Sequence, residues 1–569
     1  MRIGKIISLS VAAFLAFVGL TSCSAQSDID SLFGGAAFNQ PLDYSEFARP
    51  EGARPTNQMI DGHLTLKGGQ VASGFEALHD PDGIAGTAIN RVRRLPAMDI
   101  WLVQSGDAIV PVVRGIIKSP HSYFDLVFSP GAVWQDDSDY SRISLPFAFM
   151  EKNANCVHNG VLTARISGAG QLSKVLLQVA SETCGYFKFN MWGSYDAAWQ
   201  GVSPAGADAV REAYEAEVAN RMPVAPLSSL EGTDAAVFAQ ADTINPADMT
   251  TYGVVHDGTH YVGGCDTRYG PYPYCDSMVL PSYSLAKSLA GGIGLMRLEK
   301  LYPGVRHALM RHHVPPCDSR PWHGVRLEHL ADMTTGNYVS PDAHLDEGSS
   351  GYLPFFLAVT SAEKTGFSCS YFPRKRRPGE TWVYHTSDTY LLGVAMSGFL
   401  EKRRGRGADY YDDLVVPLWQ ALDLGPLTKE IRRTARANPE PFSGYGMLLY
   451  RDDIARIAAA LAGRDPRLEG ALDAGLLDGA MQRDPSDRGQ EAGGSTLRYN
   501  NTFWGWNAKD TLGCADDTWL PFFSGYGGIT VVMLPGGSVY YYFSDGYNFS
   551  FSEPVKELAN VSPVCGVTP

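Results

Sequence analysis

The chain has 569 residues, of which 44% are apolar and 19% are charged, so it is globular and too long for one compact core. Its formal charge of −14 becomes −16 when the two basic residues near the N-terminus are left out. So acidic a chain argues against nucleic acid as a partner, because nucleic-acid binding needs clustered lysine and arginine.

The first segment has the pattern of an export signal. Two basic residues precede an apolar run at positions 6–20, which is as long as a signal-peptide core and too short for a membrane span. We therefore predict that residues 1–22 are a signal peptide. The segment ends LTSC, which resembles the lipobox of bacterial lipoproteins and predicts that Cys23 carries lipid on the periplasmic face of a membrane. Cleavage after Ala25 is the alternative, and it would leave a soluble periplasmic or secreted protein.

Eight cysteines follow the leader, an even number that predicts disulfides in an oxidising compartment. They are Cys156, Cys184, Cys265, Cys275, Cys317, Cys369, Cys514 and Cys565. We expect nearest neighbours to pair, Cys156 with Cys184 and Cys265 with Cys275, and the sequence leaves the other pairings open. No metal is expected, because no two cysteines are spaced C-x-x-C and none stands at ligand spacing from a histidine pair.

Residues 27–222 have the pattern of repeated strands. Short β-branched or aromatic runs such as DIWLVQS, ISLPFAFM, GVLTARIS and KVLLQVAS are separated by Gly, Pro, Asn and Asp. Such repeats predict an antiparallel β-sandwich. Near the end of this region, Val210, Tyr214 and Val218 stand four residues apart and predict a helix. Residues 223–234 then have the composition of a linker.

Residues 235–569 are predicted to form a second domain, with strands at both ends and helices between them. YGVVHDGTHYV is a hairpin with Asp257 and Gly258 at its turn, and GITVVMLPGGSVYYYFSDG is a second hairpin that turns at residues 535–537. Strands from both ends can share one sheet, against which the helices pack. We therefore predict an α+β fold.

The stretch SYSLAKSLAGG places Ser284 three residues before Lys287 at the start of a helical run. Residues i and i+3 lie on one face of a helix, so the amine can reach the hydroxyl and act as its base if burial lowers the pKa of the lysine. The alternative is a serine N-cap with a solvated lysine. A second S-x-x-K, within SAEKTG at residues 361–366, lacks a matching context and is predicted to be a polar loop.

The segments around Ser284 have the motif order of a known superfamily. The hairpin VVHDGTHYV and SYSLAKSLAGG are followed by VRLEHLADMTTGNY, PGETWVYHTSDTYLLG, YYDDLVVPLWQALDLGP, GYGMLLYRDDIARIAAALAG and SGYGGITVVMLP. In this order they resemble the serine β-lactamase and penicillin-binding-protein superfamily, most nearly its class C-like esterase and 6-aminohexanoate-dimer hydrolase branch. The resemblance runs from about residue 251 to the C-terminus. It implies a β-lactamase-like fold, an antiparallel sheet flanked by a helical subdomain, preceded here by the β-sandwich domain.

The resemblance implies a role for each of three side chains. Ser284 is the nucleophile that forms an acyl-enzyme, Lys287 is its base or proton partner, and Tyr384 is the tyrosine of the second motif. The alternative for Tyr384 is a core aromatic. His385, next to it, receives no role from the resemblance and is expected to be a neighbouring wall residue.

The third motif of the superfamily maps onto Tyr526, Gly527 and Gly528, where many members carry Lys or His in the first position. The backbone N–H of Ile529, or one beside it, would join that of Ser284 as the oxyanion hole. Without a basic residue at this place, the grip on the carboxylate of penicillins is in doubt.

Thr386, Trp504 and Phe523 are expected to line a substrate pocket. Thr386 stands where β-lactamases usually have Asn, which also favours an esterase or amidase over a true β-lactamase. Trp504 and Phe523 flank the third motif and are expected walls for an apolar acyl or alcohol group, with core packing as the alternative.

Together these patterns predict an exported serine hydrolase, without cofactor or metal, that cleaves an ester or amide bond in a small molecule. Its only link to a membrane would be a lipid on Cys23. A β-lactamase or D,D-peptidase acting on penicillins or peptidoglycan is one alternative, and an inert envelope protein that binds a glycan or a partner is another. For the N-terminal domain, glycan binding and a packing role that shapes the cleft both stay open.

Overall fold

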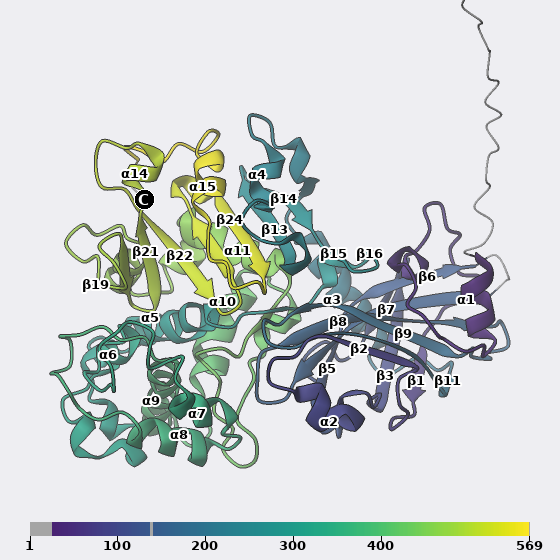
Figure 1. The fold of residues 1–569 in the computed structure, drawn as a ribbon, viewed down its shortest axis with the longest axis horizontal. Coiled ribbons are helices and arrows are strands. Elements are labelled where there is room, and N and C mark those ends of the chain that lie inside the picture. The colour runs from purple at the N-terminus through teal and green to yellow at the C-terminus, as the bar shows by residue number, and fades with distance from the viewer. Residues whose placement is uncertain (1–25, 137–139, 568–569) are drawn as a thin grey trace, which may run out of the picture.

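The computed structural model describes residues 26–136 and 140–567, so the predicted signal peptide and Cys23 lie outside the described residues. An N-terminal β-domain and a larger C-terminal domain lie side by side (Figure 1). No helix within the described ranges is long and apolar enough to cross a membrane.

The N-terminal domain is built on one sheet of 11 strands in the order β11-β1-β3-β4-β6-β7-β8-β9-β10-β2, with β5 paired to β7. The strands are β1 (Gly62–Leu66), β2 (Gly74–His79), β3 (Met98–Ser105), β4 (Ala108–Pro111), β5 (Phe124–Phe128), β6 (Gly131–Gln135), β7 (Ser141–Glu151), β8 (Val157–Ile166), β9 (Val175–Thr183), β10 (Lys188–Tyr195) and β11 (Ala197–Gln200). The helices are α1 (Gln26–Phe33), α2 (Ile84–Val92) and α3 (Ala207–Ala219).

This sheet curls around one main cluster of buried side chains. Leu64 of β1 and Phe189 of β10 belong to the same cluster of buried side chains, although several strands separate them in the sheet. The predicted sandwich of two sheets is not confirmed, because all eleven strands belong to one sheet. Short strands with polar breaks have the same local pattern in a sandwich and in one strongly curved sheet, so the sequence did not distinguish the two.

The helix predicted around Val210 is confirmed as α3, but its predicted apolar stripe does not hold it in place. Val218 is 42% exposed. Ion pairs attach the helix to the sheet instead, with Arg114 Nη2 donating to Glu217 Oε1 at 2.9 Å.

The C-terminal domain contains a sheet of nine strands in the order β12-β14-β13-β24-β23-β22-β21-β20-β19. They are β12 (Val224–Pro226), β13 (Met249–His256), β14 (Thr259–Gly264), β19 (Gln490–Glu491), β20 (Leu497–Asn500), β21 (Phe503–Asn507), β22 (Trp519–Gly525), β23 (Ile529–Met533) and β24 (Val539–Ser544). Two small ladders join β15 (Asp266–Thr267) to β16 (Gly270–Pro271) and β17 (Leu280–Pro281) to β18 (Leu448–Leu449).

Both predicted hairpins are confirmed, and their strands share one sheet as expected. β13 turns into β14 at Asp257 and Gly258, both of which have positive φ, and β23 turns into β24 at residues 535–537. β13 pairs directly with β24, which joins the start of the domain to its end. The predicted linker at residues 223–234 is not purely a linker, since β12 pairs in parallel with β14 at the edge of the sheet.

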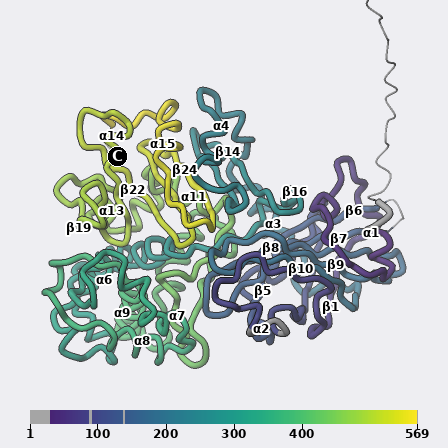
Figure 2. The backbone as a smooth tube through the Cα atoms, in the orientation of Figure 1, coloured from purple at the N-terminus to yellow at the C-terminus, as the bar shows by residue number. Residues whose placement is uncertain are grey.

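Helices cover both faces of this sheet, which makes the domain α+β. They are α4 (Ala235–Ala239), α5 (Ile293–Leu301), α6 (Leu327–Ala331), α7 (Leu353–Leu357), α8 (Ser361–Ser370), α9 (Thr386–Arg404), α10 (Val416–Ala421), α11 (Arg451–Ala462), α12 (Pro466–Glu469), α13 (Ala474–Ala480), α14 (Lys509–Leu512) and α15 (Ser552–Leu558). Val531 packs with the core of α5, α9 and α11, and Val532 packs with α15 on the opposite face. The segments of α6 to α9 gather below the sheet in Figure 2.

The polar loop predicted at residues 361–366 is wrong. These residues begin α8, whose first turn is closed by reciprocal hydrogen bonds between Thr360 and Glu363. Lys364 is fully buried, donates to Tyr445 Oη at 3.0 Å, and has its pKa lowered to about 7 by burial. Helical spacing places this lysine inside the domain, which a loop assignment did not anticipate.

Four disulfides join the eight cysteines. Cys156–Cys184 and Cys265–Cys275 are the two pairs expected from sequence proximity. The other two bonds are Cys317–Cys369 and Cys514–Cys565.

Candidate active site

Ser284 lies in the turn that leads from β17 into a helix. The residues after it form a wide π-helical turn, Lys287–Gly292, which continues as α5. Lys287 Nζ donates to Ser284 Oγ at 3.0 Å, and only 1% of the Lys287 side chain is exposed. The two side chains that the sequence paired therefore lie within hydrogen-bond distance, and the lysine is buried rather than solvated.

Burial shifts Lys287 toward its neutral form. Its amine also donates to Thr386 Oγ1 at 2.8 Å and to the Gly444 carbonyl at 3.0 Å. Burial lowers the pKa of Lys287 to about 8, and the charge of Glu347 acts in the opposite direction. A lysine with such a pKa is partly neutral near pH 7 and can take up a proton, which an ordinary lysine does not do.

Tyr384 is the third group at this centre. Its ring centroid lies 5.0 Å from Lys287 Nζ, and its phenol is within reach of the Ser284 hydroxyl. Burial raises the pKa of Tyr384 above its usual value of 10.0, the charge of Glu347 adds to this, and the hydrogen bond to Ser284 acts the other way. The phenol is therefore neutral at physiological pH and can donate a hydrogen bond.

Glu347, a half-buried carboxylate in the loop before α7, was not among the residues predicted from the sequence. Glu347 Oε2 accepts the backbone N–H of Thr386 at 2.9 Å, and Oε1 accepts the Thr386 hydroxyl. The Thr386 hydroxyl thus accepts from Lys287 and donates to Glu347, so it connects the amine to the carboxylate. No motif or periodic pattern marks this loop, and only the long-range fold brings it here.

His385 holds the loop that carries Glu347. Its Nε2 lies 3.1 Å from Asp346 Oδ2, and its ring stacks on Phe372 with centroids 3.9 Å apart. Burial lowers the pKa of His385, but the hydrogen bond to Asp346 and the Asp388 carboxylate, whose Oδ2 lies 3.7 Å from Nδ1, outweigh this and raise it to about 9. The imidazole is therefore protonated at neutral pH, and it is fully buried behind the site rather than exposed in its wall.

The predicted third motif forms the turn between β22 and β23. Gly525 lies against the serine segment, since a Cβ built on it would stand 3.1 Å from the Ser282 carbonyl oxygen. Gly527 and Gly528 have φ of 91° and 103°, which favours glycine, and they pack toward the opposite side, where a Cβ on Gly528 would stand 2.4 Å from the Asn548 carbonyl oxygen. The two glycines thus shape the turn rather than face Ser284.

Two backbone N–H groups near the serine are free to bind a substrate. Within the described residues, neither the Ser284 N–H nor the Tyr526 N–H has a hydrogen-bond acceptor. The Tyr526 ring lies 5.5 Å from that of Tyr283, which places the turn beside the serine segment. Ile529, the donor expected from the sequence, lies inside the sheet, paired with both β22 and β24.

Aromatic rings pack beside Tyr384. Trp504 stacks near Tyr384, with centroids 6.1 Å apart, and near Phe522 at 5.8 Å. The expectation for Phe523 is wrong, because side chains alternate along a strand and Phe523 points to the other face, where it is fully buried against Phe503. The ring centroid of the exposed His344, a residue not predicted from the sequence, lies 5.2 Å from that of Tyr384.

One group within the described ranges has the spacing of metal ligands. Glu151, Cys156, His158 and Cys184 offer ligand atoms that all lie within 4.8 Å of one another. The two cysteines form a disulfide, so the thiolates that would bind a metal are absent. Glu151 already accepts hydrogen bonds from two tyrosines, and the cluster does not fit a metal in this oxidised form.

A serine hydroxyl, a lysine that can lose its proton, a phenol and free N–H groups are the parts of a covalent acyl-transfer centre. No protein-family model matches the chain, and no curated protein matches it in sequence. The chain is similar in structure to a putative 6-aminohexanoate-dimer hydrolase from Bacillus anthracis, with 15% identity and a TM-score of 0.41 over 56% of this chain and 78% of the other. It is also similar to a class C beta-lactamase, with 13% identity and a TM-score of 0.40 over 58% and 96% of the two chains.

Proposed function

We propose that the protein is an exported serine hydrolase that cleaves an ester or amide bond through an acyl-enzyme on Ser284. One observation carries the proposal: the amine of a fully buried lysine lies 3.0 Å from the Ser284 hydroxyl and has a pKa of about 8. A hydroxyl is a weak nucleophile until a base accepts its proton, and Lys287 supplies that base.

The reaction proceeds in two transfers of the acyl group. Ser284 Oγ attacks the substrate carbonyl carbon while its proton passes to Lys287 Nζ. The N–H groups of Ser284 and Tyr526 stabilise the negative oxygen that forms, a contribution of about 3 kcal/mol per donor. The proton then passes, with Tyr384 as the relay, to the leaving alcohol or amine as the bond to it breaks. A water molecule attacks the acyl-enzyme by the same route in reverse and restores the Ser284 hydroxyl.

The site residues support an ester or amide substrate with an apolar group. By the resemblance, Tyr526 and Thr386 stand where β-lactamases usually have Lys or His and Asn, and both changes support an ester or amide substrate over a penicillin. Trp504 and Tyr384 offer an aromatic surface beside the serine, which suits an apolar acyl or alcohol group.

The disulfide bonds support the proposal that the protein is exported. Four disulfides form the complete pairing of the eight cysteines after the leader. Such bonds persist outside the cytoplasm and are rare inside it. We further propose that Cys23 carries the lipid that holds the protein at the periplasmic face of a membrane.

The proposal is tested by assaying the purified mature protein with p-nitrophenyl esters, D-amino-acid amides and nitrocefin. The Ser284→Ala variant is expected to lose all hydrolysis and keep the melting temperature of the wild type. Ser288→Ala is the matched control, because Ser288 is a buried serine one turn later that donates to the Thr502 carbonyl at 2.6 Å, and it is expected to stay active. Full activity of Ser284→Ala excludes Ser284 as the nucleophile, and turnover of nitrocefin alone favours a β-lactamase.

A further inference from the structure

Asn155, in the loop between β7 and β8 of the N-terminal domain, reaches the serine segment of the C-terminal domain. Its side chain is 2% exposed, and its Oδ1 accepts the Tyr283 backbone N–H at 2.6 Å and the Ser282 hydroxyl at 3.5 Å. These are the two residues directly before Ser284. A side chain from one domain therefore makes buried hydrogen bonds to the backbone beside the nucleophile of the other.

Tyr283 has a conformation that needs such support. Its φ of 40° lies in the left-handed region, which is unfavourable for a residue other than glycine. Such a residue keeps its conformation only where its surroundings fix it. Besides the bond to Asn155, the Tyr283 hydroxyl donates to Cys156 Sγ at 3.3 Å. These two contacts of Tyr283, through its backbone N–H and its hydroxyl, come from the N-terminal domain.

The same amide also orders the surroundings of Lys287. Asn155 Nδ2 donates to the Met447 carbonyl at 3.4 Å, and that carbonyl also accepts the Ser282 N–H at 3.0 Å. Gly444 stands three residues before Met447, and its carbonyl accepts a hydrogen bond from the amine of Lys287. Asn155 thus joins the segment of the nucleophile to the segment that orients its base.

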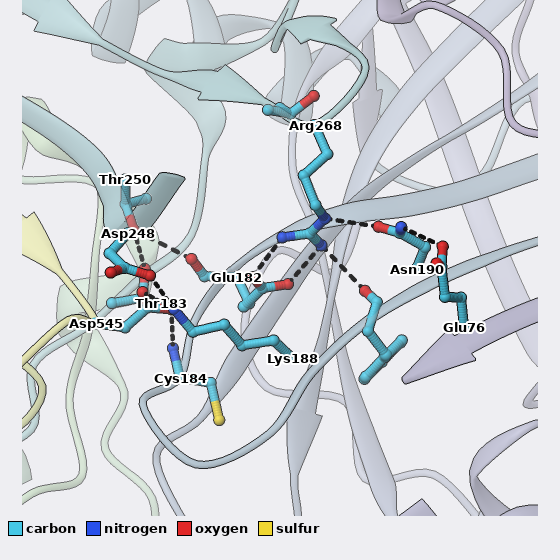
Figure 3. Close-up of polar contacts among 12 residues, drawn as sticks. Glu76, Glu182, Thr183, Cys184, Lys188, Asn190, Asp248, Thr250, Arg268 and Asp545 are labelled. Atoms are coloured by element: carbon cyan, nitrogen blue, oxygen red, sulfur yellow. Dashed lines mark hydrogen bonds and ion pairs between the residues drawn. The ribbon is translucent and has the colours of Figure 1, made fainter. Parts of the chain in front are cut away.

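The disulfide partner of Cys156 supports the other side of the site. The Cys184 N–H donates to Asp545 Oδ2 at 3.0 Å, and Lys188 donates to Asp545 Oδ1 at 2.6 Å (Figure 3). Ser544, next to Asp545, donates its N–H and its hydroxyl to the Gly528 carbonyl, at 3.2 and 2.7 Å. Gly528 belongs to the turn that presents the Tyr526 N–H, so one disulfide holds both edges of the candidate oxyanion hole.

We propose that the N-terminal domain is part of the catalytic unit, and that Asn155, fixed by the Cys156–Cys184 disulfide, is a positioning residue that orients Ser284 for attack. The inference rests on the proposed acyl transfer at Ser284 and adds the requirement for the second domain. It differs from simple packing, because a packing partner would contribute to stability without changing the reactivity of the serine.

The chain contains a matched control for this distinction. Asn159 is also a buried asparagine of the same domain, and it makes two hydrogen bonds to the backbone of Val279, at 3.0 and 3.1 Å. Val279 stands before β17, outside the turn that carries Ser284. Asn155→Ala and Asn159→Ala therefore each remove an amide that crosses the domain interface, but only Asn155 touches the residues next to the nucleophile.

The test compares the rate at which a fluorophosphonate probe labels Ser284 in the full mature chain, together with kcat and KM for an ester substrate and the melting temperature. Asn155→Ala is expected to slow labelling and kcat about 10- to 100-fold with little change in KM, because a small misplacement of a reacting group has effects of this size. Asn159→Ala is expected to lower the melting temperature and to label at the wild-type rate. Asn155→Asp, which keeps an acceptor oxygen for the Tyr283 N–H, is expected to label faster than Asn155→Ala.

The possible results separate the two proposals. A wild-type chain that the probe does not label, and that hydrolyses nothing, overturns both the proposed function and the role of Asn155. Wild-type labelling with equal rates in Asn155→Ala and Asn159→Ala overturns the positioning role alone. A slower rate confined to Asn155→Ala, with recovery in Asn155→Asp, supports it.

Discussion

Replacing Glu347 by glutamine removes the negative charge that acts on Lys287 and changes the side chain little in shape. The amide keeps an oxygen for the Thr386 N–H, which donates to Glu347 at 2.9 Å in the wild type. Because the charge of Glu347 raises the pKa of Lys287, its removal must lower that pKa further below the usual value of 10.5.

The size of the effect follows from the distances. Lys287 Nζ lies 2.8 Å from Thr386 Oγ1, which in turn donates to Glu347. Two hydrogen bonds in series place the two charges about 5 Å apart, where their attraction is about 3 kcal/mol at an effective dielectric constant near 20 and about 0.8 kcal/mol in water. Glu347 is half-buried, so an intermediate value applies. At 1.36 kcal/mol for each pH unit, the pKa of Lys287 should fall from about 8 to roughly 7.

The assay is the pH dependence of kcat/KM for an ester substrate, which reports the pKa values of the free enzyme. The wild type is expected to gain activity as pH rises through about 8, where Lys287 loses its proton. In Glu347→Gln the midpoint should move to lower pH. Glu363→Gln is the control, because Glu363 is an exposed carboxylate that caps α8. An unchanged midpoint in Glu347→Gln, or a shift to higher pH, refutes the assignment of Lys287 as the base.

Two further substitutions test the other polar groups of the site. Tyr384→Phe keeps the ring beside Trp504 and removes the hydroxyl. We therefore expect kcat to fall about 10²- to 10⁴-fold while the melting temperature stays within a few degrees of the wild type. An unchanged kcat would show that Tyr384 does not transfer the proton. The pKa of His385 is raised to about 9 in the folded protein, so its contribution to stability is complete below pH 6.5 and is lost as pH rises to about 9. His385→Gln should therefore show a smaller drop in melting temperature between pH 6 and pH 9 than the wild type. An equal drop in both proteins would contradict a positive charge on His385 at neutral pH.

Local signals in the sequence predicted the hairpins and the central pair of the site. Asp257 and Gly258 suit a tight turn by their backbone preferences, and the spacing of Ser284 and Lys287 follows from helix geometry alone. Such features depend on residues close in the chain. A sequence can therefore reveal them without knowledge of the rest of the fold.

Long-range pairing decided the features that the sequence did not reveal. The strand patterns did not show that one sheet curls on itself. Neighbouring side chains of β22 point to opposite faces of the sheet, so Phe522 and not Phe523 lies beside Trp504. Glu347 and Asn155 come from loops without motifs, and the fold alone brings them to Thr386 and Tyr283.

The most direct measurement of the acyl-enzyme is mass spectrometry of the mature protein quenched during turnover of an ester. We expect the mass of the acyl group on the peptide that contains Ser284, and no added mass in Ser284→Ala. An acyl group on another residue, or hydrolysis by Ser284→Ala at the wild-type rate, would contradict catalysis by Ser284 and Lys287.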